Sequence, residues 1–321
     1  MTQLSTLLTQ ALDRTVTRWE FTWAGPGGSP PTNAQIDAAG ARAAVLARVG
    51  GPYVAGTQWS GESGDSGMDF AVTIEYRFPA DTVAARVLEA NAKADAVVAE
   101  VIKPSMGDYE KELALHDWLV RHARYDLANF QANTVPNPEY TPYGVLVLGT
   151  GVCQSYASAF QQLADRAGLE TRMVSGTGNG ADHAWNQVQV DGVWYNLDVT
   201  WDDPAGAPPA HTYFNVDDRT LSADHKWDAK TAMPCTSLAA NWFVRQGAVA
   251  HDLKELSARI STALAHRDTK LMAKVEVFSP ARFRADVLAA VKRAATLAGI
   301  SLSWSLSVDE AQGVIDATFK Y

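Results

Sequence analysis

The segment 154–169, QSYASAFQQLADRAGL, repeats its apolar residues at helical spacing. The apolar positions are three or four residues apart, so they share one face of a helix: Tyr156, Phe160, Leu163 and Ala167. Gly168 follows directly, at the position where many helices end in the left-handed conformation. The pattern therefore predicts a helix that begins near residue 153 and ends before Gly168.

Two strand-like segments, 183–190 and 193–200, lie on either side of an Asp-Gly dipeptide. Asp-Gly between such segments is a strong signal for a β-hairpin with a two-residue turn. A two-residue turn determines the register of the strands, and here it places Val190 opposite Val193. We therefore predict an antiparallel hairpin over 183–200.

The predicted register brings two polar side chains together. It pairs Trp185 with Asp198 and makes His183 the diagonal neighbour of Asp198, with Cβ atoms roughly 7 Å apart. The hairpin face that contains them is polar and aromatic: His183, Trp185, Gln187, Gln189, Trp194, Asn196, Asp198 and Thr200. The other face is apolar and is predicted to face the core: Val188, Val190, Val193, Tyr195, Leu197 and Val199.

The two ends of the chain show the same order of predicted elements. A helix, a strand, a helix and two strands are predicted over 5–14, 16–23, 32–49, 53–59 and 68–78. The same order is predicted over 252–266, 270–278, 281–299, 301–308 and 313–321. We therefore expect two small βαββ-type α+β units, at 1–80 and 246–321. They flank a core at 81–245, which begins with a helix over 81–102.

Composition limits the classes of partner. A chain of 321 residues with 47% hydrophobic and 20% charged residues is typical of a globular protein with two or three domains. The net charge of −9 makes nucleic acids and anionic membranes unfavourable partners. No apolar stretch reaches the ~20 residues that span a bilayer. The first residues lack a signal-peptide pattern, so we expect a cytoplasmic protein, or an exported one if a leader has been removed.

Cys153 follows Gly151 and Val152 and lies in or just before the first turn of the predicted helix. The helix dipole and the free N–H groups of a first turn favour a thiolate and can hold an oxyanion. The alternative is a small buried apolar residue. His183 follows thirty positions later and Asp198 fifteen after that. These are the parts of a Cys–His–Asp nucleophilic site, in which Asp198 orients the ring of His183 toward Cys153.

Other residues that could bind or react give weaker signals. Cys235 has no histidine or acid beside it, so we predict a structural role. His116 and His122 are six positions apart on a predicted helix over 108–123 and do not share a face. His211 and His225 lie near acidic residues that do not match a calcium loop, and we expect solvated or capping roles for both. We therefore predict no metal site and no cofactor.

Three segments resemble the blocks of the transglutaminase-like superfamily, which has a papain-like fold and includes transglutaminases and bacterial cysteine peptidases. They are GVCQSYA, DHAWNQV and WYNLDVTWDD, which begin at positions 151, 182 and 194. The resemblance extends over about 105–245. It implies an α+β core in which the helix with the cysteine packs on an antiparallel sheet with the histidine and the aspartate. It also implies that Cys153 is the nucleophile, His183 the base and Asp198 its partner.

The resemblance implies acyl transfer on amide bonds through a thioester, with a protein or peptide as substrate. We expect a cysteine peptidase or amidase, because the chain lacks a recognisable calcium site and the large multidomain build of transglutaminases. A transglutaminase that uses the same triad and a non-catalytic protein-binding module are the alternatives. Gln154 and Tyr143 are candidate oxyanion donors, and Trp185, Asn186 and Trp201 are candidate cleft residues. The oligomeric state stays open.

Overall fold

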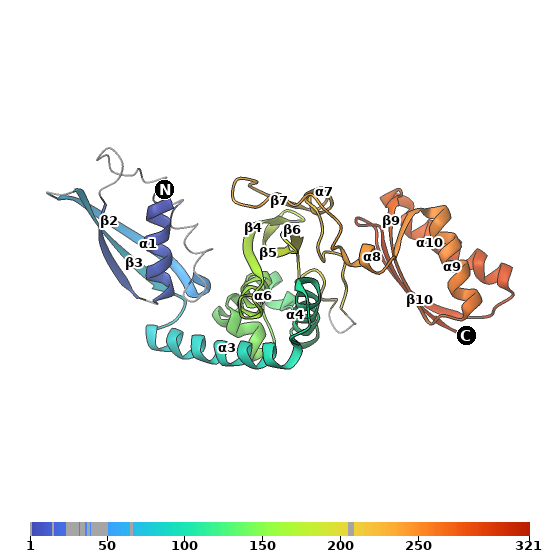
Figure 1. The fold of residues 1–321 in the computed structure, drawn as a ribbon, viewed down its shortest axis with the longest axis horizontal. Helices are drawn as coiled ribbons and strands as arrows, with labels where there is room; N and C mark the ends of the chain where they lie inside the picture. The colour runs from blue at the N-terminus through green and yellow to red at the C-terminus, as the bar shows by residue number, and fades with distance from the viewer. Residues whose placement is uncertain are drawn as a thin grey trace.

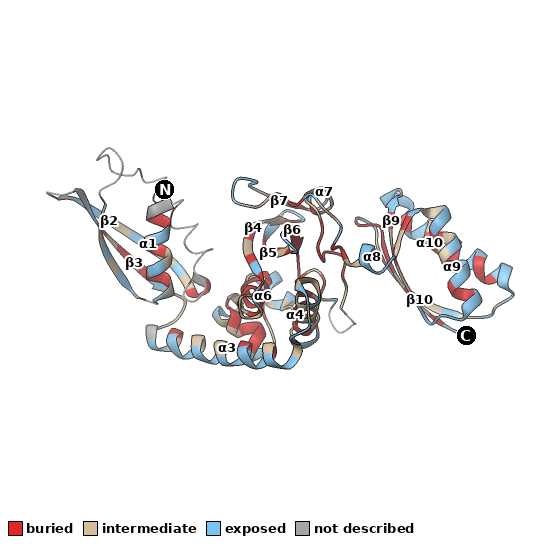
Figure 2. Ribbon diagram, in the orientation of Figure 1, coloured by how far each residue is buried: buried red, intermediate tan, exposed pale blue. Residues whose placement is uncertain are grey.

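The structure is a computed structural model that describes residues 2–14, 16–23, 32, 36, 39, 51–64, 67–204 and 209–321. Within these residues the strands form three sheets, and each sheet packs with helices around its own group of buried apolar residues. Figure 1 shows the three groups in chain order along the long axis, and Figure 2 shows buried residues inside each of them. The chain is an α+β protein.

The central group packs helices against a four-stranded antiparallel sheet of order β6-β5-β4-β7. Its strands are β4 (Glu170–Gly178), β5 (Ala181–Val190), β6 (Val193–Leu197) and β7 (His225–Trp227). Its longer helices are α3 (Ala80–Val101), α4 (Asp108–His122) and α6 (Cys153–Ala167). The shorter helices are α5 (Leu127–Ala132), α7 (Asp218–Leu221), α8 (Trp242–Arg245), the 3₁₀ helix Asn137–Tyr140 and the π-helix Gly144–Leu148.

Helix α6 has the bounds and the buried face that its apolar spacing predicts. Tyr156, Phe160 and Leu163 are fully buried in the central core. Gly168 ends the helix with a φ of 78°, in the left-handed conformation that glycine adopts without strain. The burial of this face places the first residue of α6, Cys153, beside the sheet.

The hairpin of β5 and β6 has the predicted turn and register. Asp191 and Gly192 have φ values of 51° and 81°, as a type I′ turn requires, and Val190 pairs with Val193. One of the six hairpin residues predicted to face the core does not, because Val193 at the turn is 40% exposed. The other five members of that face are buried: Val188, Val190, Tyr195, Leu197 and Val199.

Strand β6 ends at Leu197, three residues before the predicted end. The cause is Asp198, whose Oδ1 accepts hydrogen bonds from the backbone N–H groups of Thr200 and Trp201. Such side-chain bonds to nearby backbone favour a turn over a continued strand. The chain therefore leaves β5 at Asp198, and the carboxylate is held where the strand stops.

The C-terminal group contains the predicted elements and one further strand. Its elements are β8 (Val249–Asp252), α9 (Leu253–His266), β9 (Lys270–Val277), α10 (Pro280–Ala298), β10 (Ser303–Asp309) and β11 (Val314–Lys320). The sheet order is β10-β11-β9-β8. β8 pairs in parallel with β9 and was not predicted, because four residues are too few to show a period.

The N-terminal group contains α1 (Thr2–Asp13), β1 (Arg18–Trp23), the 3₁₀ helix Gly51–Tyr53, β2 (Val54–Gly64) and β3 (Gly67–Tyr76). The predicted helix over 32–49 lies outside the described residues, apart from positions 32, 36 and 39. The sheet order is β1-β3-β2, with antiparallel pairs throughout.

The two end groups share a sheet arrangement. In each, the last strand of the unit lies between the two earlier ones and is antiparallel to both: β3 between β1 and β2, and β11 between β9 and β10. The repeated order of elements thus corresponds to a repeated order of strands, while the domain boundaries at 80 and 245 stay predictions.

In the described part of the chain, no helix is both long and apolar enough to cross a membrane.

Candidate active site

Cys153 is the first residue of α6 and keeps 8% of its surface exposed. It packs against Ala157 of the same helix and Ala184 of β5. Gly151, two positions earlier, is needed for this approach: a Cβ there would lie 2.6 Å from the hydroxyl oxygen of Ser155. The structure therefore places the thiol at the N-terminal end of α6, where helices favour anionic groups.

His183 lies on β5 between the other two predicted triad residues. Its Nε2 is 2.7 Å from Oδ2 of Asp198, and its ring is also hydrogen bonded to the side chain of Cys153. Because Nε2 faces Asp198, Nδ1 is the nitrogen left for the sulfur. Burial alone would lower the pKa of His183, but the Asp198 carboxylate outweighs it and raises the pKa to about 10.

Asp198 is fully buried and accepts four hydrogen bonds. Oδ1 accepts from the backbone N–H groups of Thr200 and Trp201, at 3.0 and 3.2 Å. Oδ2 accepts from His183 and from Nε2 of His225, the latter at 3.1 Å. Burial alone would raise the pKa of Asp198, but the two imidazoles lower it well below its usual range. The carboxylate is thus held ionised and oriented.

His225, on β7, is a second histidine on the same carboxylate oxygen. Its Nδ1 is 2.6 Å from Oδ1 of Asp224, and it is only 1% exposed. Burial disfavours its charged form, but hydrogen bonds to Asp198 and Asp224 raise its pKa. The expectation of a solvated or capping role was wrong for His225, because pairing of β7 with β4 carries it into the core.

Two tryptophans surround the imidazoles. Trp201 lies with its ring centre 5.3 Å from that of His183 and 4.2 Å from that of His225. Trp185 is 1% exposed and lies 5.1 Å from His225 by the same measure. Gly178 at the end of β4 permits this packing, because a Cβ there would lie 2.7 Å from the Trp201 ring. The rings fix the positions of both histidines.

The remaining predicted site residues are spread more widely. Asn186 is buried and donates to the carbonyl of Ala157, which ties β5 to α6. Gln154 is the second residue of α6 and is partly exposed, so its oxyanion role stays a prediction. The hydroxyl of Tyr143 donates to Glu89 on α3 at 3.2 Å. The structure therefore engages this hydroxyl with α3 and does not bring it to the thiol.

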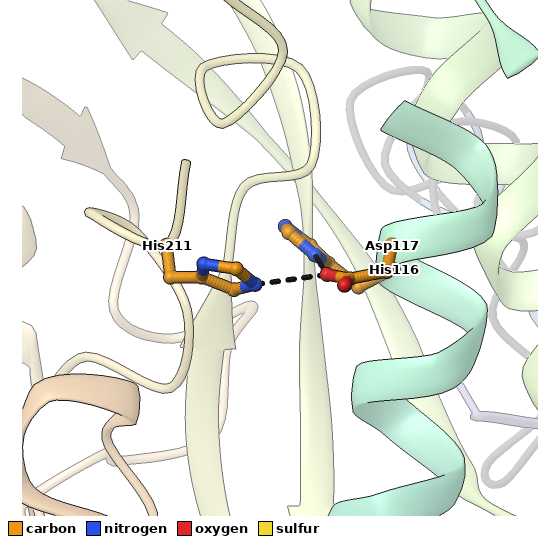
Figure 3. A group of neighbouring side chains, drawn as sticks. All are labelled: His116, Asp117 and His211. Atoms are coloured by element: carbon orange, nitrogen blue, oxygen red, sulfur yellow. Dashed lines mark hydrogen bonds and ion pairs between the residues drawn. The ribbon is translucent and has the colours of Figure 1, made fainter. Parts of the chain in front are cut away.

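A second histidine cluster joins α4 to the segment after the hairpin (Figure 3). Nε2 of His211 and Nδ1 of His116 lie 2.8 and 3.1 Å from Oδ1 of Asp117. Nε2 of His116 lies 3.2 Å from Asp202. His211 is 7% exposed, so the solvated role expected for it was wrong too. The reason is the stacking of its ring on Trp242 of α8, with ring centres 4.6 Å apart.

Both clusters have the residue types that hold metal ions. In each, the donor atoms of two histidines and one aspartate lie within 4.8 Å of one another. In each, one aspartate oxygen already accepts hydrogen bonds from both imidazoles. Burial alone would lower the pKa of His116, but its bonds to Asp117 and Asp202 raise it to about 9. A protonated ring that donates from both nitrogens fits these contacts.

Cys235 differs from Cys153 in its surroundings. It is 1% exposed, and its sulfur lies 3.3 Å from Nε2 of Gln187. Burial raises the pKa of this thiol to about 12. Both cysteines are free thiols. The contacts of Cys235 agree with the structural role predicted for it.

Sequence reasoning missed several residues around the triad. Besides His225, they are Asp224, Gln312 of the C-terminal group, and Tyr125, which packs beside Cys153. One signal was present: ADHAW at 181–185, which contains His183, recurs as ADHKW at 223–227, which contains His225. The two segments form strands on either side of β4. Nothing in the sequence marks Gln312.

These contacts define a site with a thiol, an imidazole and a carboxylate on an α+β core. Residues 95–199 match the model of the transglutaminase-like superfamily, and this stretch contains all three side chains. This part of the chain is a transglutaminase-like core. The match supports a thiol-dependent enzyme in general terms.

Named relatives match about a third of the chain. Kyphoscoliosis peptidase of Homo sapiens is 28% identical over 119 residues, which cover 33% of this chain and 18% of that protein. The same peptidase of Mus musculus is 26% identical over 117 residues, 33% of this chain and 17% of the relative. The crystal structure of a TGase superposes with a TM-score of 0.34 and 16% identity, over 48% of this chain and 47% of that one. The chain thus spans less than a fifth of the length of the curated relatives.

Proposed function

We propose that this chain performs thiol-dependent acyl transfer on amide bonds through Cys153, His183 and Asp198, and that water accepts the acyl group. This makes it a cysteine peptidase or amidase. The observation that carries the proposal is the position of His183, which is bonded to the Cys153 side chain and lies 2.7 Å from Asp198. A buried ring held between a thiol and an ionised carboxylate is the arrangement of an activated nucleophile.

In the first half of the reaction, Cys153 Sγ bonds to the carbonyl carbon of the substrate. His183 takes the thiol proton at Nδ1 and gives it to the leaving nitrogen when the C–N bond breaks. Asp198 accepts from Nε2 throughout, so the ring keeps its orientation and its positive charge is balanced. Backbone N–H groups at the start of α6 face the developing oxyanion.

In the second half, the thioester is cleaved by water. His183 takes one proton from the water as its oxygen bonds to the carbonyl carbon, and returns it to Sγ as the C–S bond breaks. An acid product leaves and the thiol is restored. A transglutaminase would use the same thioester with an amine as acceptor. The peptidase name of the relatives favours water.

The test is the rate of alkylation of the two free thiols by iodoacetamide near neutral pH, followed by peptide mass spectrometry. Cys153 is expected to label faster than Cys235, whose thiol is buried and has a pKa of about 12. His183→Ala is expected to slow labelling of Cys153, whereas His266→Ala, at an exposed position on α9, is the matched control. Equal and slow labelling of both thiols would contradict the proposal and leave the non-catalytic binding module.

A second assay distinguishes the acceptors. The unaltered chain is incubated with a protein substrate, once alone and once with a fluorescent primary amine. Peptide cleavage that is lost in Cys153→Ala supports the hydrolase. Incorporation of the amine without cleavage, also lost in Cys153→Ala, would overturn hydrolysis in favour of the transglutaminase.

A further inference from the structure

The C-terminal group contributes the side chain of Gln312 to the surroundings of the triad. Gln312 lies in the turn between β10 and β11 and is 4% exposed. Its Nε2 donates to Oδ2 of Asp224 at 2.8 Å, across 88 residues of sequence. A glutamine in a hairpin turn is ordinarily solvated, so its burial against a carboxylate of the central group marks a specific contact.

From Asp224 a continuous set of hydrogen bonds leads to the thiol. Oδ1 of Asp224 is 2.6 Å from Nδ1 of His225, and Nε2 of His225 is 3.1 Å from Oδ2 of Asp198. The same oxygen of Asp198 accepts from His183, which is bonded to Cys153. Gln312 is therefore the outermost member of a buried network that ends at the nucleophile.

The turn that presents Gln312 is held in place. Oδ1 of Asp309 accepts from the backbone N–H groups of Ala311 and Gln312, at 3.0 and 2.9 Å. Gly313 has a φ of 67°, and its carbonyl accepts from the N–H of Val275 at 2.8 Å. The side chain is thus presented by a rigid support, as an oriented network requires.

Gln312 also completes the bonding of a buried charge. Asp224 accepts from His225, from the hydroxyl of Tyr213 at 2.7 Å and from Gln312. Without Gln312, one oxygen of this buried carboxylate loses a donor, and the remaining bonds must rearrange around it. His225 is hydrogen bonded to both Asp224 and Asp198, so a displacement of Asp224 changes the bond of His225 to Asp198, the acceptor that orients His183.

We propose that Gln312 is a positioning residue for the Cys153–His183–Asp198 site, acting through Asp224 and His225, so that the C-terminal group is part of the catalytic unit. The inference rests on the proposed function. Gln312 touches neither the substrate nor the reacting atoms in this assignment, and its effect reaches the thiol only through the network. Figure 1 shows the C-terminal sheet beside α8, next to the central group that holds the triad.

The experiment measures iodoacetamide labelling of Cys153 in the full chain. Gln312→Met keeps the length of the side chain but removes the donor, and it is expected to slow labelling by roughly two- to 150-fold, the range of couplings within one network. Glu310→Gln, in the same turn and exposed to solvent, is the matched control and is expected to leave the rate unchanged.

A double-mutant cycle separates positioning from simple support of the fold. In a His225→Gln background the network is already interrupted, so Gln312→Met is expected to have little further effect on labelling. An effect of the same size in both backgrounds, with a parallel fall in melting temperature, would show a structural role and overturn the inference. An unchanged rate in Gln312→Met would overturn it as well. Slow labelling of Cys153 in the unaltered chain would instead overturn the proposed function.

Discussion

At the scale of single residues, Asp198 explains how the site is held together. A buried carboxylate is costly unless its charge is paired and its oxygens are hydrogen bonded. Here one oxygen accepts from two backbone N–H groups and the other from two imidazoles. The backbone bonds end β6 and fix the carboxylate, and the fixed carboxylate then fixes His183. The same residue thus shapes the chain and orients the proposed base.

The first prediction concerns this carboxylate. Asp198→Asn keeps the size of the side chain but removes its charge, so Nε2 of His183 loses its counterion. We expect labelling of Cys153 by iodoacetamide to slow by roughly 10²-fold, the order of a general-base contribution. Asp202→Asn is the matched control, because Asp202 is equally buried but bonds to His116 of the second cluster. Equal rates in Asp198→Asn and the unaltered chain would contradict the role.

The second prediction concerns the space around the imidazole. A Cβ at Gly178 would lie 2.7 Å from the Trp201 ring and 3.2 Å from the His183 ring, so Gly178→Ala must displace one of them. We expect both slower labelling of Cys153 and a lower melting temperature. Gly56→Ala is the control, because a Cβ there would first meet Glu75 at an ordinary 3.6 Å. If Gly178→Ala labels as fast as the control, the Trp201 packing does not orient His183.

At the scale of elements, α4 carries titratable groups into the core. Burial raises the pKa of Glu112 to about 8, and one of its oxygens accepts from Asn215 at 2.6 Å. In the unfolded chain a glutamate ionises near pH 4.3. Between these values the folded chain holds a proton that the unfolded chain has lost, so the free energy of unfolding falls as the pH rises from about 4.3 to about 8.

The third prediction follows from that sign. Glu112→Gln keeps the shape of the side chain, but its amide does not ionise, so the stability of the variant does not fall with pH through this group. We expect its melting temperature to exceed that of the unaltered chain by several degrees at pH 8, and the difference to shrink at pH 5. Thermal unfolding followed by circular dichroism at both values measures it. Glu100→Gln, exposed on α3, should show no such difference. A difference in melting temperature between Glu112→Gln and the unaltered chain that does not change with pH would contradict the prediction.

The elements also show how far the sequence could predict this molecule. Helix α6 and the hairpin follow from local rules, because helical spacing and an Asp-Gly turn act within a few residues. The pairing of His183 with Asp198 followed from the register of that turn. The end of β6 could not be predicted in this way, because it depends on a side-chain bond at Asp198. Strand β8 could not either, because four residues show no period.

At the scale of the whole molecule, the contacts that the sequence did not predict join segments that are far apart along the chain. His225 reaches Asp198 across 27 residues, and Gln312 reaches Asp224 across 88. The recurrence of ADHAW as ADHKW marks His225 in the sequence, but nothing marks Gln312, because burial is decided by which faces pack together. The repeated order of elements at the two ends was readable as a pattern. That one repeat contributes a side chain to the triad network required the structure.

The fourth prediction concerns how the whole chain unfolds. Within the described residues, the three sheets lie in separate parts of the sequence, and each sheet packs with buried apolar residues of its own. Units with separate cores and small interfaces unfold independently, so scanning calorimetry of the full chain should show more than one transition. Labelling of Cys235 identifies the transition of the central group, because this thiol is buried in that group and should label only when the group unfolds.

Gln312→Met should shift the C-terminal and central transitions apart by weakening the contact between the two groups. A single transition with equal calorimetric and van't Hoff enthalpies would contradict independent units, and would mean that contacts such as Gln312 to Asp224 couple the groups into one cooperative fold.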